Sequence, residues 1–509
     1  MRAGKSWGMI SSRARGESNN LTRWTENPVG VLVLFDLTGE TENLPFVVPT
    51  AHHFAKKRCL LLEGRSGMES KIHQLKYPCY DMTTHEVGML IESFTMDGYK
   101  GARNEVILRL HPQMNILFGE NGTGKSTLLD GMMVALSWFT ARVRSPYANG
   151  NAVHENDINN GRNHSKLSIE CVTEKNNPCS WTTYKTRRGF SVKGKSDYSQ
   201  LNAVVRSIQE QREQEGPNVN LPLIGLYPTS RTGLNVRTRI RKRHSFDPIT
   251  LYESDQIWSA NFTSFYEWFR DQQAIENELT NNGPTTLSSD ESLMVVRNAI
   301  HTFMPDFRNL HFRFRSPQGL YVHKKGFGEL RIEKLSGGEQ SLIALIGDIA
   351  RKLVMANPTL SNPLEGRGII LIDEIDLHLH PKWQCSIVEN LRKTFPNCQF
   401  ILTSHSPAII SGGRVGEVHH LSIDSDTISI AEGVPSYGRE MDEIFQDFLH
   451  LPTIRPKETY DQIKEIYSLM EEDIDKAENL LHELQGIITD DSELEKIQNL
   501  IIRKRTIGI

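Results

Sequence analysis

The octet GENGTGKS at residues 119–126 has the glycine spacing and the Lys-Ser ending of a phosphate-binding loop. Glycines let such a loop fold close around an anion and point backbone N–H groups at it. The apolar run at 114–118 predicts a buried strand before the loop, and the apolar spacing at 126–139 predicts a helix after it. This context is the one the motif requires. It predicts a phosphate site made of Gly119, Glu120, Asn121, Gly122, Thr123, Gly124, Lys125, Ser126 and Thr127.

Two carboxylates follow a second apolar run, GIILIDE at 368–374. Such a run is typical of a fully buried parallel strand, whose carboxyl end is where ligands bind in open α/β sheets. With Lys125 on the terminal phosphates and the Ser126 hydroxyl on Mg²⁺, Asp373 is placed to hold the ion through its water shell. Glu374 is then the group that orients and deprotonates an attacking water. An ordinary acidic strand end is the alternative, which the preceding phosphate loop disfavours.

A third apolar run, QFILTSH at 399–405, ends in His405. A helix expected at 382–395 separates this run from the previous one, so the two strands should be neighbours in one parallel sheet. A lone histidine at a strand end is more often structural than catalytic. Here the shared sheet edge brings His405 within reach of a γ-phosphate.

The segment LSGGEQ at 335–340 opens an amphipathic helix over 341–354. A glycine pair at a helix start again offers N–H groups to an anion. A chain with one phosphate loop has no need of a second clamp for its own nucleotide. We therefore expect Ser336 and Gly338 to serve the nucleotide of a partner subunit.

Together these segments resemble the ABC-type ATPases, in the soluble branch shared with SMC proteins and repair ATPases. The resemblance implies ATP and Mg²⁺ as cofactors, with Mg²⁺ at Ser126 and Asp373, Glu374 as general base and His405 as γ-phosphate sensor. It also implies a head-to-tail homodimer or higher oligomer, in which Asp376 lies in a subunit-contact loop. The signature acting in trans would be Ser336, Gly337, Gly338, Glu339 and Gln340.

Within this branch, residues 89–509 are similar to the PtuA ATPases of Septu-type anti-phage systems, including those attached to retrons. The supporting segments are LYPTSR at 226–231, FTSFYEWFRDQQAIENE at 262–278 and the C-terminal tail. The resemblance implies a regulatory or sensor subunit that hydrolyses ATP, has no nuclease activity of its own and controls an HNH-type nuclease, PtuB. Retron versions add a reverse transcriptase with its RNA and DNA.

The expected fold class is α/β. It comprises an ABC-type ATPase head, with a P-loop parallel sheet and an antiparallel β-subdomain, a helical insertion and a helical C-terminal tail. The expected domains are an N-terminal extension with little order (1–88), the head's first half (89–199), the insertion (200–305), the head's second half (306–440) and the tail (441–509). Residues 1–88 show no sustained periodicity, so they are either a family-specific extension or precede a true start at Met89.

The insertion contains a basic run. Such a run is usually a solvated face, but beside a nucleotide-binding head it is also a candidate nucleic-acid contact. The candidate residues are Arg237, Arg239, Arg241, Lys242 and Arg243.

The tail predicts helices over 457–505, because apolar residues recur there at three- and four-residue spacing. Ser492 and Glu495 have the spacing of a capping box that opens a last helix. So long an apolar face either packs on the head or docks another subunit, and we favour docking.

Composition places the chain in the cytoplasm. Its net charge is −4 with 24% charged residues, and it contains no apolar run long enough to span a membrane. The six cysteines show no C-x-x-C pairing, which suits reduced thiols.

Three other functions compete with a defence ATPase. An OLD-type nuclease would need a Toprim domain after His405, where the pattern is mostly helical. A transporter subunit is disfavoured by the large insertion and by Glu339 in the signature. A DNA-repair SMC-like ATPase is harder to separate, and a neighbouring HNH gene would distinguish the two.

Overall fold

The computed structural model describes residues 88–173, 177–191, 194–216, 218–229, 247–253, 262–281, 288–424, 427–449 and 455–507, plus the backbone of four short strands before residue 88. The chain divides into two units, Met1–Thr84 and His85–Ile509. In the first unit, β1 (Arg23–Glu26) pairs antiparallel with β2 (Leu32–Phe35), and β3 (Leu60–Leu61) pairs antiparallel with β4 (His73–Gln74). The rest of the expectation for 1–88 lies outside the described residues.

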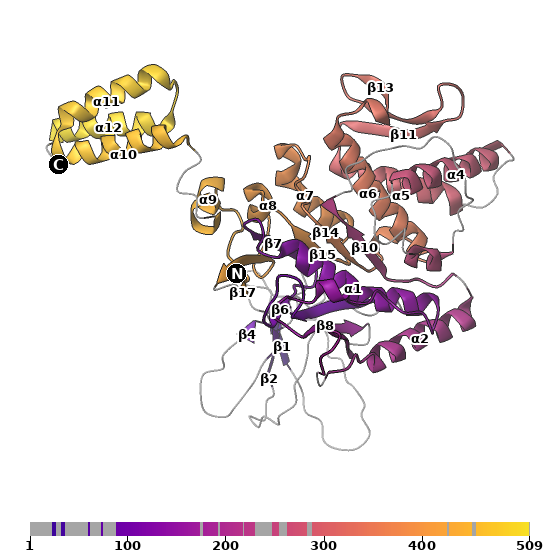
Figure 1. Ribbon diagram of the computed structural model, residues 1–509. Helices are drawn as coiled ribbons and strands as arrows, with labels where there is room; N and C mark the ends of the chain where they lie inside the picture. The colour runs from indigo at the N-terminus through magenta and orange to yellow at the C-terminus, as the bar shows by residue number, and fades with distance from the viewer. Residues whose placement is uncertain are drawn as a thin grey trace. The chain divides into compact units, whose positions relative to one another are not determined.

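The second unit is built around a six-stranded sheet of order β10-β14-β15-β7-β16-β17 (Figure 1). Its strands are β7 (Met114–Gly119), β10 (Leu223–Tyr227), β14 (Gly368–Ile372), β15 (Cys398–Thr403), β16 (Val418–Asp424) and β17 (Thr427–Glu432). The first five run parallel, and β17 is antiparallel to β16. Every residue of β7, β10, β14 and β15 is buried, because helices and a second sheet cover both faces. The expected parallel sheet, with the strands of 368–372 and 399–403 as neighbours, is confirmed.

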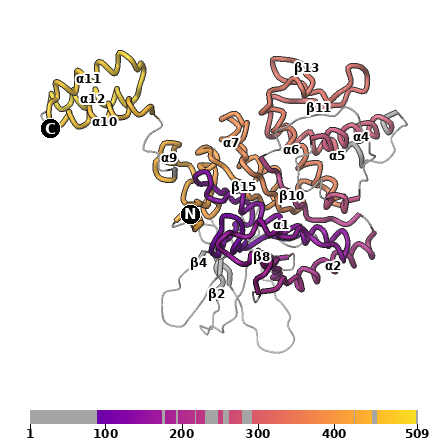
Figure 2. Tube along the Cα trace, viewed as in Figure 1, coloured from indigo at the N-terminus to yellow at the C-terminus, as the bar shows by residue number. Residues whose placement is uncertain are grey.

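Segments far apart in sequence alternate in this sheet, as the chain trace in Figure 2 shows. β7 from the amino-terminal half lies between β15 and β16 from the carboxyl-terminal half. The phosphate loop therefore emerges beside the strand that ends in the TSH segment.

One face is covered by a four-stranded antiparallel sheet of order β6-β5-β8-β9 and by two helices. These are β5 (Met89–Asp97), β6 (Val106–Arg109), β8 (His164–Thr173), β9 (Pro178–Thr186), α1 (Lys125–Arg144) and α2 (Ser199–Glu215). Alternate residues of β6 and β8 face inward, and they pack with α1 in one apolar core. The four-stranded sheet is the antiparallel β-subdomain that the sequence predicted.

A second apolar core contains helices from the segment expected as the insertion and from the chain that follows it. They are α4 (Phe262–Asn281), α5 (Ser288–Phe303), α6 (Gly337–Ala356), α7 (Pro381–Thr394), α8 (Pro407–Ser411) and α9 (Met441–Leu449). A three-stranded antiparallel sheet precedes α6, formed by β11 (Phe307–Arg313), β12 (Gly319–Lys324) and β13 (Gly328–Arg331).

The segment expected as a helical insertion is not wholly helical. It holds α2, α4 and α5, but its residues Leu223–Tyr227 form β10, the edge strand of the central sheet beside β14. All five residues are buried, so burial against the head determines their conformation. The domain boundaries stay a prediction.

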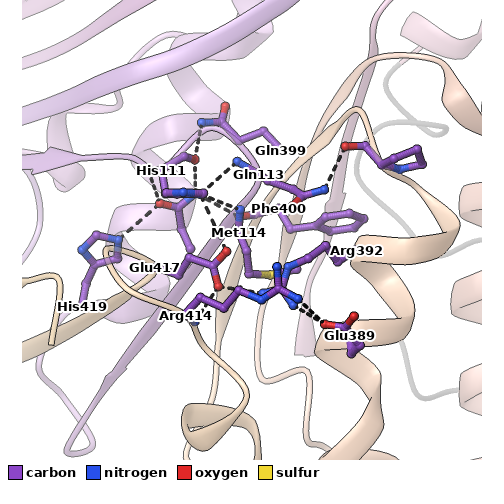
Figure 3. A network of polar contacts seen from close by, with 12 residues as sticks. His111, Gln113, Met114, Glu389, Arg392, Gln399, Phe400, Arg414, Glu417 and His419 are labelled. Carbon is purple, nitrogen blue, oxygen red and sulfur yellow. Dashed lines mark hydrogen bonds and ion pairs between the residues drawn. The ribbon is translucent and has the colours of Figure 1, made fainter. Parts of the chain in front are cut away.

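A buried polar network joins the amino ends of β7, β15 and β16, at the sheet edge opposite the phosphate loop (Figure 3). Arg392 pairs with Glu417 at 2.7 Å, and both are nearly inaccessible. The Asn115 amide accepts from the His111 N–H at 2.6 Å and donates to the Phe400 carbonyl at 3.1 Å. Buried polar groups of this kind fix strand register because each loses its partner if a strand slips.

The tail forms α10 (Lys457–Glu472), α11 (Ile474–Ile487) and α12 (Ser492–Ile507), as predicted. The three helices share a small apolar core of their own, made of Ile463, Ile466, Ala477, Leu481, Leu484, Leu494, Ile497 and Ile501. The capping prediction was wrong by one residue. The Asp491 carboxylate accepts from the N–H groups of Glu493 and Leu494, because a carboxylate one residue earlier reaches the free N–H groups of the first turn. Among the described residues, no helix is both long and apolar enough to cross a membrane.

Candidate nucleotide-binding site

The loop between β7 and α1 has the backbone geometry of an anion cradle. Gly122 and Gly124 adopt φ values of 86° and 94°, which disfavour residues with a Cβ. Gly124 caps α1 without a side-chain hydrogen bond, so the first N–H groups of α1 are not used by a side-chain cap. A helix start with such N–H groups attracts phosphate.

Lys125 lies across this loop. Its ammonium donates to the carbonyls of Gly119 and Glu120, each at 2.8 Å. Burial lowers its pKa, while the nearby carboxylates of Asp373 and Glu374 act in the opposite direction. The side chain is thus held inside the loop, with acidic groups close to its charge.

The hydroxyl of Ser126 and the carboxylate of Asp373 are in direct contact. Ser126 Oγ donates to Asp373 Oδ1 at 3.2 Å, although 247 positions separate the residues. Thr403 Oγ1 also donates to Asp373 Oδ1, at 2.6 Å. An oxygen-only set of a hydroxyl and a carboxylate suits Mg²⁺, which takes one or two protein ligands and keeps its waters. The residues present therefore fit the ion that the sequence implied.

Glu374 is held in an unusual backbone conformation. Its φ is 46°, in the left-handed region, which costs a non-glycine residue about 1–3 kcal/mol. The backbone N–H of Glu374 donates to Thr403 Oγ1 at 2.7 Å, and the side chain is half-buried. Strain of this kind persists only where the surroundings enforce it, which is common at functional sites.

His405 follows β15 and is half-buried. Its backbone N–H donates to Asp376 Oδ1 at 3.4 Å. Burial and the positive charge of Lys125 lower the pKa of the ring, so the imidazole is uncharged near neutral pH. In that form one ring nitrogen donates and the other accepts.

The LSGGEQ turn is ordered by its own side chains. Ser336 caps α6, and the Glu339 carboxylate accepts from the Ser336 N–H at 2.9 Å, completing a capping box. Glu339 also pairs with Lys324 of β12 at 2.6 Å. Ser336 and Gly337 are exposed. Within the described residues, no hydrogen bond or ion pair joins residues 336–340 to the phosphate loop.

The structure thus brings together Lys125, Ser126, Asp373 and Glu374, while Gly338 of the signature packs against the His378 carbonyl. Two contributors were not assigned from sequence. Thr403 belongs to the TSH segment, and its position at the end of a buried strand could have identified it. Lys324 lies in no recognisable motif, so no sequence pattern signals its role. The basic run containing Arg237, Arg239, Arg241, Lys242 and Arg243 lies outside the described residues.

Comparison with known families gives the class of protein. Residues 90–420 match the RecF/RecN/SMC N terminal domain family, so the chain belongs to that family. It is an SMC-like head protein of α/β class, as the sequence predicted.

Among its relatives are proteins from bacterial retrons and Septu systems. The chain is 32% identical over 374 residues to "Retron Ec83 probable ATPase" of Escherichia coli, covering 62% of this chain and 68% of that protein. It is 32% identical over 344 residues to "Retron Vc95 probable ATPase" of Vibrio cholerae, covering 58% and 66% respectively. It is 22% identical over 427 residues to "Septu protein PtuA" of Bacillus thuringiensis, covering 81% and 97%. The resemblance to PtuA inferred from the motifs is confirmed.

Solved structures similar to this chain include an Smc head bound to the C-winged helix domain of ScpA. It is 14% identical, with a TM-score of 0.41, and covers 67% of this chain and 98% of that one. An SMC head domain from Thermotoga maritima has a TM-score of 0.38 at 12% identity, with coverages of 67% and 98%.

Proposed function

We propose that this chain binds ATP with Mg²⁺ and hydrolyses it as the regulatory subunit of an anti-phage defence complex. The observation that carries the ATPase assignment is the contact between Ser126 and Asp373, with Lys125 next to Ser126 and Glu374 next to Asp373 in the chain. Oxygen ligands for Mg²⁺, a cation in the phosphate loop and a carboxylate one residue beyond the metal ligand are the parts that phosphoryl transfer to water requires.

In this assignment each residue has a defined task. Lys125 neutralises the terminal phosphates, and Ser126 and Asp373 would hold Mg²⁺, which would supply further positive charge there. Glu374 accepts the proton of the attacking water. His405, uncharged and beside the cluster, donates a hydrogen bond to a γ-phosphate oxygen.

The signature residues 336–340 complete the site of a second copy. Ser336 and Gly337 are exposed. Within the described residues, no hydrogen bond or ion pair joins the signature to the phosphate loop of its own subunit. Both observations support a head-to-tail dimer. A twofold-symmetric pairing, in which the signature of each subunit meets the phosphate loop of the other, puts one signature over each nucleotide.

The defence role is supported by the names of the relatives, which are retron and Septu proteins. We propose that the nucleotide state of this chain controls a separate HNH-type nuclease, and that a retron reverse transcriptase with its RNA and DNA is a further partner. The chain itself is proposed to have no nuclease activity.

The helices α10–α12 are the proposed docking element for the nuclease. Their core shares no residue with the two cores of the head. Tyr467, Ile487, Leu500 and Ile502 remain exposed on them, and apolar side chains on helices suit helix-in-groove docking.

The first experiment is calorimetric titration of the purified chain with ATP and Mg²⁺. Lys125→Ala should abolish binding because it removes the point charge on the terminal phosphates. Lys185→Ala, at an exposed lysine of β9, is the control and should bind as the wild type does. Near-wild-type affinity in Lys125→Ala would overturn the assignment.

The second experiment tests the partner. The chain is co-expressed with its genomic neighbours, and the complex is weighed by native mass spectrometry. An HNH-type protein should co-purify, and plasmid cleavage should require it. Deleting 457–509 should weaken that association while ATP binding persists, since the head cores contain none of these residues. Plasmid cleavage by the chain alone, free of any contaminant, would contradict the proposal.

A further inference from the structure

The sheet β11–β13 is basic in a chain whose net charge is negative. Between Asp306 and Lys334 there are seven Lys or Arg against three Asp or Glu, while the whole chain has a net charge of −4. The excess does not form a run in sequence. Strand alternation puts Arg308, Arg313 and Arg331 on one face, and Arg315, Lys325 and Lys334 lie just outside the strands.

The two faces of this sheet differ sharply. Leu310, Phe312, Leu320 and Val322 face inward and belong to the apolar core of the head. The register pairs Arg308 with His323, His311 with Tyr321, and Tyr321 with Arg331 on the opposite face. The outward face therefore carries Arg308, His311, Arg313, His323 and Arg331 around one tyrosine.

Part of this positive charge has no acidic partner. Arg308, Arg315, Lys325 and Lys334 are exposed, and none has an ion pair within the described residues. Among the described residues of this face, Arg313 and His311 pair with Glu329, and Arg331 pairs with Glu333. The face is thus free to bind a polyanion.

Aromatic rings lie among these charges. Phe314 is 43% exposed in the turn after β11, and Phe327 is 71% exposed in the turn between β12 and β13. Lys324 lies 4.7 Å from the Phe327 ring centroid, and the Arg313 guanidinium lies 4.2 Å from the Tyr321 centroid. Exposed phenylalanines are costly in water, and they stack well on unpaired bases.

A groove continues from the edge of this sheet. It has a volume of about 510 Å³ and lies between α5 and β11. Its polar lining is contributed by Glu276, Arg297, Asn298, His301, Arg308 and Asn309. Arg297 is held by Glu276 at 3.2 Å, so its planar guanidinium is fixed in place. A backbone crossing the sheet would enter this groove beside Arg308.

We propose that the outward face of β11–β13, with the adjoining groove, binds single-stranded nucleic acid. Unpaired arginine and lysine side chains contact phosphates, and Phe314 and Phe327 stack on bases. Charge complementarity alone would also suit an acidic protein. The two exposed rings beside cations favour a ligand that offers both phosphates and aromatic faces. The site is separate from the nucleotide cluster, so the proposal does not depend on ATP hydrolysis.

The test is fluorescence anisotropy with a labelled 30-nucleotide oligo-dT and the full chain, without ATP, over a range of KCl concentrations. Parallel titrations with oligo-rU and with a 30-base-pair duplex show whether the chain prefers single-stranded DNA, single-stranded RNA or double-stranded DNA. The wild type should bind both single strands, and the duplex more weakly because its bases are not free to stack.

Two double variants separate the contributions. Arg308→Gln with Lys325→Gln should weaken binding at least fivefold and lower the slope of log affinity against log salt by about 1.4, since each lost phosphate contact removes about 0.7. Phe314→Ala with Phe327→Ala should weaken binding at least about thirtyfold and leave the salt slope unchanged.

Lys185→Gln with Lys464→Gln is the charge-matched control, because both lysines are exposed and lie on β9 and α10. It should bind as the wild type does. Thermal unfolding of every variant checks that the fold is intact. The proposal is overturned if the wild type does not bind, if the control loses as much as the basic variant, or if duplex is preferred. It also falls if the basic variant changes only the oligomeric state in light scattering, which would make this face a protein interface.

Discussion

The carbonyl oxygen of His378 occupies the space next to Gly338. A Cβ built on Gly338 would lie 2.3 Å from that oxygen, closer than any two such atoms can approach. His378 itself has φ of 63°, so an unusual backbone conformation directs its carbonyl toward the start of α6. The second glycine of the signature is therefore required by a contact within its own subunit.

The contact between Gly338 and His378 joins the signature to the loop that contains His378. In the proposed dimer, both of these elements contact the partner subunit. The loop of His378 also carries Asp376, whose carboxylate accepts from the His405 N–H. On the other side of the same loop, Gln384 donates to the Leu379 carbonyl and accepts from the Ser406 hydroxyl. Signature, contact loop and the turn of His405 are thus packed as one continuous unit.

The two signature glycines should consequently respond differently to alanine. Gly338→Ala forces the His378 carbonyl or α6 to move, and should destabilise the head by about 1–3 kcal/mol, as overpacking does. Gly337→Ala adds a Cβ with nothing within 4 Å, so its effect on unfolding should stay within about 0.5 kcal/mol. Urea denaturation of both variants measures the difference. Equal destabilisation would show that the packing at His378 is not what requires Gly338.

The sequence could predict the parts of the site that follow buried strands. GIILIDE and QFILTSH are apolar runs with polar ends, and adjacent parallel strands bring Asp373 and His405 to one edge. It could not predict the contact between Gly338 and His378, because no local pattern encodes which loop packs on a glycine. β10 was missed since a five-residue apolar run inside a helical region fits either helix or strand until its neighbour is known.

The basic face of β11–β13 was missed for a related reason. Inspection of the sequence detects charges that lie close together along the chain, such as those at 237–243. Arg308, Arg313 and Arg331 share a face only because a bulge and two turns set the register of the three strands. Their grouping is a property of the sheet.

Replacing the proposed general base should separate binding from turnover. Glu374→Gln keeps the shape of the side chain and can still hold a water, but it cannot accept the proton. ATP should remain bound, hydrolysis should fall by about 10²–10⁴-fold, and ATP-closed dimers should accumulate in light scattering. Glu333→Gln, at an exposed acid outside the site, serves as control. Hydrolysis at the wild-type rate by Glu374→Gln would assign the base to another residue.

Complementation should reveal whether the signature acts in trans. Lys125→Ala and Ser336→Arg each inactivate every site of their own homodimers. In a mixed head-to-tail dimer, one site combines the intact phosphate loop of one subunit with the intact signature of the other. Equal mixing should restore up to about a quarter of the wild-type sites. ATP turnover in the mixture, with mixed dimers verified by native mass spectrometry, is the measurement. Mixed dimers without any recovery would contradict a signature that works across the interface.

The buried network at the amino ends of the central strands should make the head sensitive to mild acid. Burial lowers the pKa of His111 to about 4, assisted by the charge of Arg392, and burial lowers the pKa of His419 to about 4. Above pH 6.5 both rings are uncharged in the folded and unfolded chains, so they add no pH dependence there. Between pH 6.5 and 4 the unfolded chain gains these protons and the folded chain does not.

The free energy of unfolding should therefore fall as pH drops through that window, by up to about 3 kcal/mol for each histidine. Glu417 contributes in the opposite direction, because burial raises its pKa against the pull of Arg392 and Arg414. Urea denaturation of the wild type and of His419→Gln, compared from pH 7.5 to 5, isolates one ring, since glutamine can still hydrogen bond but does not titrate. His482→Gln, at an exposed histidine of α11, is the matched control. The variant should lose less stability than the wild type on acidification, and parallel curves for all three proteins would show that His419 is not buried in its neutral form.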